Sequence, residues 1–147
     1  MDMWDKAKRS DLMSRIRSRG NKTTELRFLS ILRANGITGW RRHAKLPGKP
    51  DFFFPAQRIA VFLDGCFWHG CAKCYTQPRT NASFWIEKVR SNKRRDRRCS
   101  TRLRALGFRV IRIWEHCLRS DRLSAVRLAA LRRMLLVAPK KMATCRK

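Results

Sequence analysis

The sequence predicts a small α/β domain in which one mixed sheet is flanked by helices. Two apolar segments, residues 58–63 and 108–114, have the length and composition of buried strands. Helical patterns lie before, between and after them, so the expected order is helix, strands, helix, strand, helix. A chain of 147 residues that is 44% hydrophobic can enclose one core, and the sequence contains no internal repeat or interdomain linker.

A basic arm over residues 1–20 is expected to precede the domain, which spans residues 21–137. The first helix of the domain is predicted over residues 25–34, because its leucines recur at the spacing of one buried helical face. Thr23 or Thr24 can cap its first turn through a side-chain hydroxyl.

Strands are predicted over residues 40–45 and 51–54, on either side of a turn that contains Pro and Gly. Pro55 ends the second strand, and a short turn leads into the strand over residues 58–63, so these two strands form a hairpin. A long helix is then predicted over residues 84–106.

The strand over residues 108–114 follows that helix. The last helix is predicted to begin at Asp121 or Ser124 and to end near residue 136. Residues 138–147 form a basic tail, in which we expect little order.

The charge of the chain is strongly biased, with 36 Lys and Arg against 10 Asp and Glu, a formal net charge of +26. Solubility needs only about 2 to 8 net charges in a small domain, so a polyanionic partner is expected, and nucleic acid comes first. A membrane surface is the weaker alternative. No apolar run has the length of a transmembrane helix and the first residues are not a signal peptide, so we expect a cytosolic protein whose cysteines are thiols or metal ligands.

A cluster of cysteines directly follows one predicted strand. Cys66, Cys71 and Cys74 have the spacing C-x4-C-x2-C, and Cys117 lies just past the next strand. Four thiolates around one ion form a closed structural zinc site, which organises a loop and leaves no open position for catalysis. Free buried cysteines and a redox role are the alternatives.

Two acids are expected at neighbouring strand ends. Asp51 opens one strand of the hairpin and Asp64 ends its partner, so their carboxylates are candidate ligands for Mg²⁺, as in many metal-dependent nucleases. An Asp after Pro also forms ordinary turns, which is the alternative. His69 in the following loop is either a zinc ligand or a general base.

The long helix carries a further acid among basic residues. Asn92 and Asp96 are spaced i, i+4 and share one helical face. Asp96 is either a partner in salt bridges or an acid held beside the metal while its neighbours contact phosphates. These neighbours are Arg94, Arg95, Arg97 and Arg98.

Segments over residues 5–118 together resemble the very-short-patch repair (Vsr) DNA mismatch endonucleases. The most specific is Gly-Cys-Phe-Trp-His-Gly-Cys at residues 65–71. The other matching segments are Asp5-Lys6-Ala7, Leu46-Pro47-Gly48-Lys49-Pro50-Asp51-Phe52, Thr80-Asn81, Phe84-Trp85, Asn92, Arg95-Asp96 and Ile113-Trp114-Glu115 with Cys117.

The resemblance implies a restriction-endonuclease-like (PD-(D/E)xK) fold and a Mg²⁺-dependent enzyme that nicks DNA 5′ of the thymine in a T:G mispair left by deamination of 5-methylcytosine. Such a nick initiates very-short-patch repair. The implied substrate is double-stranded DNA, cut by a monomer in the bacterial cytoplasm, with a functional link to a cytosine-5 methyltransferase and to mismatch-repair proteins.

The resemblance also assigns roles to particular residues. Asp51 and the backbone carbonyl of Leu63 would hold Mg²⁺, and Asp64 is a further candidate ligand. His69 and Asp96 would arrange water and the scissile phosphate, and Glu25 would support them. The implied zinc ligands are Cys66, Cys71, Cys74 and Cys117. The residues implied to wedge into the base stack are Phe67, Trp68 and Trp85, with Met13 from the other groove.

Two departures from the family pattern concern these sites. Some members carry His where this chain has Asp64, and His among the zinc ligands where this chain has Cys71 or Cys74. Two other functions remain as alternatives, namely a non-catalytic zinc-containing module that binds nucleic acid and a restriction-type endonuclease that cuts both strands.

Overall fold

The structure is a computed structural model that describes residues 20–119 and 125–136. The predicted arm, with Met13, and the predicted tail lie outside the described residues. The elements, in chain order, are helix α2 (Glu25–Ala34), strands β1 (Arg41–Arg42), β2 (Phe52–Phe54) and β3 (Ile59–Asp64), helix α3 (Ala82–Ala105), strand β4 (Arg109–Trp114), a 3₁₀ helix (Glu115–Leu118) and helix α4 (Ala125–Leu136).

The strands form a mixed sheet in the order β1-β2-β3-β4. β2 and β3 are antiparallel, as the predicted hairpin requires, whereas β3 and β4 run parallel and are joined through α3. The predicted α/β domain with one mixed sheet is confirmed. Because β3 and β4 are parallel, Asp64 and Trp114 are paired, and the segments after both strands leave the same edge of the sheet.

Most predicted elements are confirmed to within a few residues, and the first helix has the predicted bounds. The strand predicted over residues 40–45 is wrong in length, because pairing is confined to Arg41–Arg42. His43 adopts a φ of 56°, in the left-handed region, which is incompatible with a continuing strand. The two predicted starts of the last helix lie among the residues that are not described.

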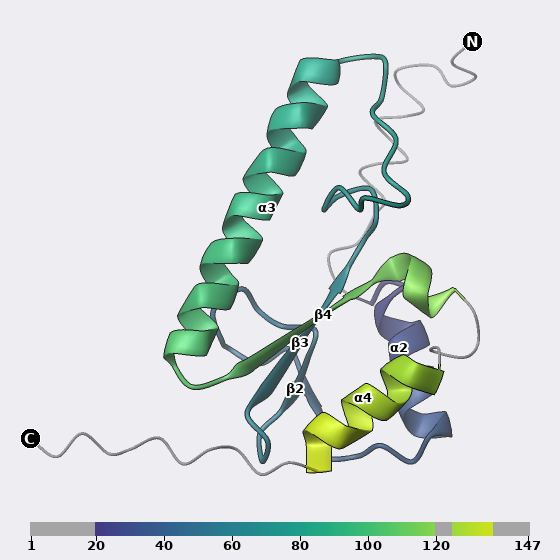
Figure 1. Ribbon diagram of the computed structural model, residues 1–147, viewed down its shortest axis with the longest axis vertical. Helices are drawn as coiled ribbons and strands as arrows, with labels where there is room; N and C mark the ends of the chain where they lie inside the picture. Colours follow the sequence, from purple (N-terminus) through teal and green to yellow (C-terminus); the bar gives the residue numbers. More distant parts are fainter. Residues whose placement is uncertain (1–19, 120–124, 137–147) are drawn as a thin grey trace, which may run out of the picture.

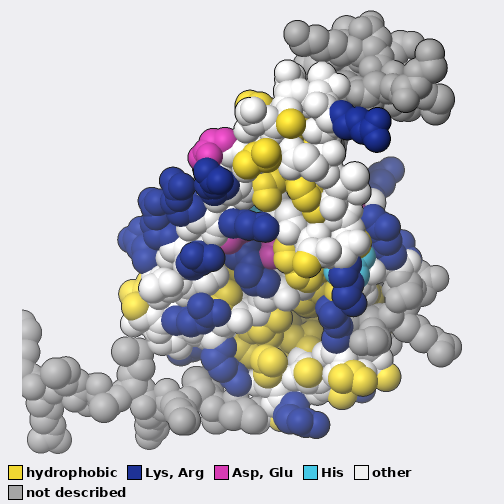
Figure 2. All heavy atoms as spheres, turned by 45° about the horizontal axis from the view of Figure 1, so that its top comes forward, with side chains coloured by type: hydrophobic (Ala, Val, Ile, Leu, Met, Phe, Trp, Pro, Cys, Tyr) yellow, Lys and Arg dark blue, Asp and Glu magenta, His cyan; other side chains and the backbone are white. Residues whose placement is uncertain are grey.

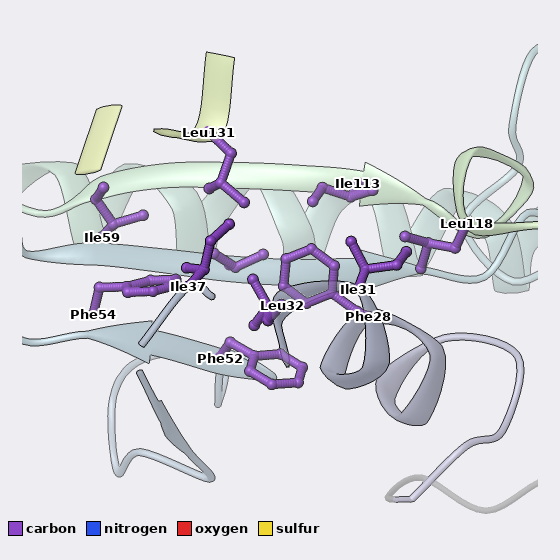
Figure 3. Close-up of a cluster of buried hydrophobic side chains, with 11 residues drawn as sticks. Phe28, Ile31, Leu32, Ile37, Phe52, Phe54, Ile59, Ile113, Leu118 and Leu131 are labelled. Carbon is purple, nitrogen blue, oxygen red and sulfur yellow. The ribbon is translucent and has the colours of Figure 1, made fainter. Parts of the chain in front are cut away.

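Helices cover both faces of the sheet (Figure 1). One face carries the larger core, in which Phe28, Leu32, Phe52, Phe54 and Ile59 are fully buried against α2 (Figure 3). The other face carries a smaller cluster formed by Ala60, Phe62 and the fully buried Leu103 of α3.

The long helix α3 contacts the sheet with its C-terminal half, and its N-terminal half extends beyond the sheet edge (Figure 1). The segment between β3 and α3, residues 65–81, is here called the Cys-rich loop. It lies between the free half of α3 and the 3₁₀ helix that follows β4. No helix in the described parts of the chain has the length and apolar composition to cross a bilayer.

Candidate active site and metal centre

A histidine and an aspartate that the sequence singled out are in direct contact. His69 of the Cys-rich loop donates from Nδ1 to Oδ2 of Asp96 on α3, at 2.5 Å. The other oxygen of Asp96, Oδ1, lies 3.1 Å from Nη2 of Arg112 on β4. Because the carboxylate holds the proton on Nδ1, the Nε2 atom of His69 is free to accept one.

Asp64 at the end of β3 completes this network. Arg112 donates from Nε to Oδ2 of Asp64 at 2.7 Å and from Nη2 to Oδ1 at 2.6 Å. Asp64 Oδ1 also lies 3.9 Å from Nδ1 of His69. Burial disfavours the charge on Asp96, but the hydrogen bond from His69 and the charge of Arg112 outweigh burial and lower the pKa of Asp96.

Asp51 lies immediately before β2 and accepts a hydrogen bond on Oδ2 from the backbone N–H of Leu63, at 2.7 Å. Burial raises the pKa of Asp51 to about 6, and the negative charges of Glu25 and Asp64 add to this effect. The charges of the two neighbouring acids act on Asp51, whereas no basic side chain is among the groups that shift its pKa. A hard divalent cation, which prefers oxygen ligands, fits such a carboxylate.

Glu25 is buried, 3% exposed, and is already paired with a basic residue. Its carboxylate accepts hydrogen bonds from the guanidinium of Arg42 and from the backbone N–H of Gly20, the latter at 3.1 Å. Arg42 also lies over the ring of Phe52, 5.7 Å from its centroid. The charge of Glu25 thus raises the pKa of Asp51, and Glu25 is itself paired with Arg42.

Four potential zinc ligands converge after β3 and β4. The ligand atoms of Cys66, Cys71, Cys74 and His116, here called the Cys/His set, all lie within 4.8 Å of one another. Nδ1 of His116 is 3.3 Å from Sγ of Cys66 and 3.5 Å from Sγ of Cys71. A tetrahedral zinc ion with ordinary bond lengths separates a sulfur and a nitrogen ligand by roughly 3.5 Å, so these residues fit zinc.

The predicted fourth ligand, Cys117, is not part of this group. Its thiol contacts the guanidinium of Arg127 on α4, and its side chain packs against the larger core. Neighbouring residues in a 3₁₀ helix point in directions about 120° apart, so His116 faces the Cys-rich loop while Cys117 faces α4. In the structure, therefore, His116 lies with the three cysteines of the loop and Cys117 lies apart from them, and the predicted ligand role of Cys117 stays a prediction.

Three contacts hold the Cys-rich loop against its neighbours. Asn92 of α3 donates from Nδ2 to the carbonyl of Trp68 at 2.8 Å. Glu115 accepts on Oε2 from the backbone N–H of Cys66 at 3.3 Å. Gly70 has a φ of +61°, and a Cβ there would lie 2.5 Å from Val89, so the loop packs on α3 too closely for any side chain at Gly70.

The aromatic side chains predicted to wedge into DNA form one cluster. Phe67 lies with its ring centroid 5.4 Å from that of Trp68 and 5.0 Å from that of Trp85, and the two indoles are 5.9 Å apart. Tyr75 and the 59% exposed Phe84 extend this aromatic cluster. Its members are partly exposed rather than buried in the core, which leaves aromatic surface beside His69.

A basic groove of about 460 Å³ lies between α3 and the Cys-rich loop. Its lining includes Tyr75 and Gln77 from the loop and, from α3, Arg90, Lys93, Arg94 and Arg97. Lys and Arg side chains crowd the face of the molecule drawn in Figure 2. Of the predicted phosphate contacts, Arg94 and Arg97 line the groove, whereas Arg95 contacts Asn92 at 3.3 Å and Arg98 is exposed outside the groove lining.

Comparison with known proteins identifies the family. The sequence profile of the family described as DNA mismatch endonuclease Vsr matches residues 1–76 of the 147. The chain belongs to the Vsr family. The DNA mismatch endonuclease Vsr of Escherichia coli strain K12 is 42% identical over 120 residues, which are 80% of this chain and 76% of that protein.

Other Vsr relatives are nicking enzymes by name. The type II nicking enzyme V.NaeI of Lentzea aerocolonigenes is 47% identical over 78 residues, 53% of this chain and 47% of that protein. The type II nicking enzyme V.XorIIP of Xanthomonas oryzae is 39% identical over 116 residues, 78% of this chain and 83% of that protein. These relatives are DNA endonucleases, which supports nuclease activity for this member of the family.

Sequence reasoning missed three residues of these sites: Arg42, Arg112 and His116. A recognisable signal existed for Arg112, because it interrupts the apolar strand Arg109–Trp114 in its middle. His116 follows an acid and precedes a cysteine, and nothing in that local pattern separates it from Cys117 as a ligand.

Proposed function

We propose that this protein nicks double-stranded DNA 5′ of the thymine in a T:G mispair that arises from deamination of 5-methylcytosine, as a monomer with a restriction-endonuclease-like fold, and that this nick initiates very-short-patch repair. The Cys/His set would hold structural zinc. Asp51, with the carbonyl of Leu63, would hold catalytic Mg²⁺, and Asp64 lies beside them. The observation that carries the proposal is the His69–Asp96 pair beside Asp64, whose charge also acts on Asp51. His69 lies on a loop that also carries partly exposed aromatic rings.

The side chains have complementary roles in the hydrolysis of a phosphodiester. When bound, Mg²⁺ would supply Lewis-acid stabilisation of the charge that develops on the phosphate. His69 accepts a proton from the attacking water at Nε2, because Asp96 keeps the other ring nitrogen protonated. Asn92 holds the carbonyl of Trp68 and thereby keeps His69 in register with Asp96.

The aromatic cluster supports selection of mismatched sites. A wedge between bases must unstack a step, which costs a few kcal/mol and costs least beside a mismatch. Phe67, Trp68 and Trp85 pack on one another, so each ring is held by its neighbours before DNA arrives.

Replacement of Trp68 by alanine is expected to reduce the preference for T:G over C:G duplexes by about tenfold, since base–aromatic stacking contributes ~1–3 kcal/mol. Binding to an intact duplex, which needs no wedge, should change little. Both affinities are measured by fluorescence anisotropy at one salt concentration. An equal loss on both duplexes would show that Trp68 serves only to support the fold of the loop.

The basic groove is the proposed contact for the DNA backbone. Replacing Arg94 or Arg97 by glutamine is expected to weaken binding equally on T:G and C:G duplexes and to reduce the slope of log K against log salt by about 1 per phosphate contact. Arg33→Gln, an exposed change on α2 on the opposite face of the sheet, is the matched control and should leave the slope unchanged. A slope that stays at the wild-type value in both groove variants would exclude the groove.

A nicking assay on three duplexes tests the function. The proposal expects cleavage of one strand of the T:G duplex, in the presence of Mg²⁺, and no cleavage of the C:G or 5-methylcytosine:G duplexes. Cleavage of both strands of the C:G duplex would instead indicate a restriction-type endonuclease. Binding without any cleavage would indicate a non-catalytic zinc module.

A further inference from the structure

Arg112 occupies the centre of the carboxylate network. It lies on β4, opposite Phe62 of β3, on the face of the sheet that α3 covers. Its guanidinium carbon lies 4.8 Å from the centroid of the Phe62 ring, so the cation makes a cation–π contact with the face of that ring. The side chain is 25% exposed, which places it at the floor of the site rather than on the outer surface.

The guanidinium joins two carboxylates, Asp64 through two hydrogen bonds and Asp96 through an ion pair. It contacts both oxygens of Asp64, at 2.6 and 2.7 Å, and one oxygen of Asp96, at 3.1 Å. The bidentate contact with Asp64 requires two N–H groups of one planar guanidinium, which only arginine has. Since Asp96 is held on one oxygen by Arg112 and on the other by His69, the orientation of the imidazole depends on Arg112 as well.

The same carboxylates could otherwise hold a metal ion. The ligand atoms of Asp64, His69 and Asp96 lie within 4.8 Å of one another, which is the spacing of a divalent-cation site. Two partly buried carboxylates side by side require positive charge, from either a metal ion or a basic side chain. Here Arg112 already supplies that charge, and both oxygens of Asp64 are engaged by it.

We propose that Arg112 is a built-in cation that takes the place of a divalent ion between Asp64 and Asp96, and that it is a positioning residue for the Asp96–His69 pair. This inference rests on the proposed function. It restricts the divalent cation to the Asp51 position and reassigns Asp64 from a candidate metal ligand to the partner of Arg112.

The inference makes a prediction about metal binding that needs no DNA and no cleavage. Zinc-loaded protein is titrated with Mn²⁺, and bound Mn²⁺ is counted by electron paramagnetic resonance. The wild-type protein is expected to bind about one Mn²⁺, and Arg112→Met about two, because the uncompensated carboxylates form a new oxygen-ligand site. Arg33→Met, which removes one exposed charge on α2, should bind as the wild type does.

A second variant keeps the test decisive if Arg112→Met does not fold. Asp64→Asn retains an oxygen that accepts from Arg112 and removes one carboxylate. If Asp64 is not a metal ligand, this variant should bind Mn²⁺ within about threefold of the wild-type affinity, whereas loss of a true ligand costs at least about tenfold. An unchanged Mn²⁺ count in folded Arg112→Met, or a tenfold loss of affinity in Asp64→Asn, would overturn the proposal.

The positioning role is tested with Arg112→Lys, which keeps the charge but loses the fork. Its Mn²⁺ count should stay at about one, while kcat for T:G nicking falls about tenfold or more with little change in KM, because a misplaced general base affects the transition state alone. A wild-type kcat would refute the positioning role. Failure of the wild-type protein to nick T:G DNA would instead refute the proposed function, and the Mn²⁺ counts would still decide the metal question.

Discussion

Replacement of Asp51 by asparagine is expected to reduce the rate of nicking of a T:G duplex by about 10³-fold or more, while binding of the duplex is retained. The amide keeps the shape of the side chain and can still accept the hydrogen bond from Leu63, so the hairpin should be undisturbed. What is lost is the negative charge that would hold Mg²⁺. Single-turnover nicking and anisotropy with the same duplex measure the two quantities.

The pH dependence of the stability of this variant is a second, independent test of the environment of Asp51. The carboxyl of Asp51 has a pKa of about 6 in the folded protein against 3.8 ordinarily, so the folded state binds a proton that the unfolded chain has released between about pH 4 and 6. The contribution of this group to stability therefore falls as pH rises through that interval. In Mg²⁺-free buffer, Asp51→Asn should be more stable than the wild type above about pH 6, by up to about 3 kcal/mol, and the difference should shrink toward pH 4.

Addition of Mg²⁺ should reverse this order, because it stabilises only a protein that binds it. Thermal unfolding with and without Mg²⁺, at pH 4.5 and 7.5, measures both effects on zinc-loaded protein. Glu87→Gln is the matched control, since Glu87 is an exposed acid on α3 that pairs only with Arg90 among the described residues, at 3.4 Å. Wild-type nicking by Asp51→Asn, or an equal response of both proteins to Mg²⁺, would exclude Asp51 as the metal ligand.

Replacement of His116 by alanine is expected to remove most of the zinc and, with it, mismatch nicking. The Cys-rich loop has little core of its own, and within the described chain it is held chiefly by the Cys/His set, Asn92 and Glu115. Without zinc, three neighbouring thiols at the site lose the ion that would hold them together, and burial already raises the pKa of Cys66 to about 11. His69 and Trp68 would then lose their fixed positions, since both lie on this loop.

The adjacent cysteine is the internal control for this experiment. Cys117→Ser changes a thiol one residue away that contacts Arg127 and the core, so zinc content should remain at about one ion per chain. Zinc is measured by inductively coupled plasma mass spectrometry on protein purified without chelators. If Cys117→Ser loses zinc and His116→Ala keeps it, the set of four cysteines that the sequence predicts is the correct one.

Several features could be predicted from the sequence because they depend on residues close together in the chain. The bounds of the helix Glu25–Ala34 are predicted correctly, although its buried face is formed by Phe28, Ile31 and Leu32 rather than by the leucine spacing, since Leu26 is exposed. The β2–β3 hairpin follows from two apolar runs joined by a short turn. Three of the four residues of the Cys/His set lie within nine positions on one loop. The placement of Asn92 and Asp96 on one face of α3 follows from helical periodicity alone.

The remaining features depend on how distant segments pack, which local periodicity does not encode. The position of His116, rather than Cys117, beside the three cysteines depends on the direction in which a 3₁₀ helix points each side chain after β4. The contact of Arg112 with Asp64 depends on the parallel register of β3 and β4, and that of His69 with Asp96 on the packing of the loop against α3. The sequence by itself therefore determined which chemical groups this protein carries, and only the tertiary structure decided which of them meet. The physical reason is that each of these contacts joins residues 27 to 50 positions apart in the chain, a separation that local periodicity does not encode.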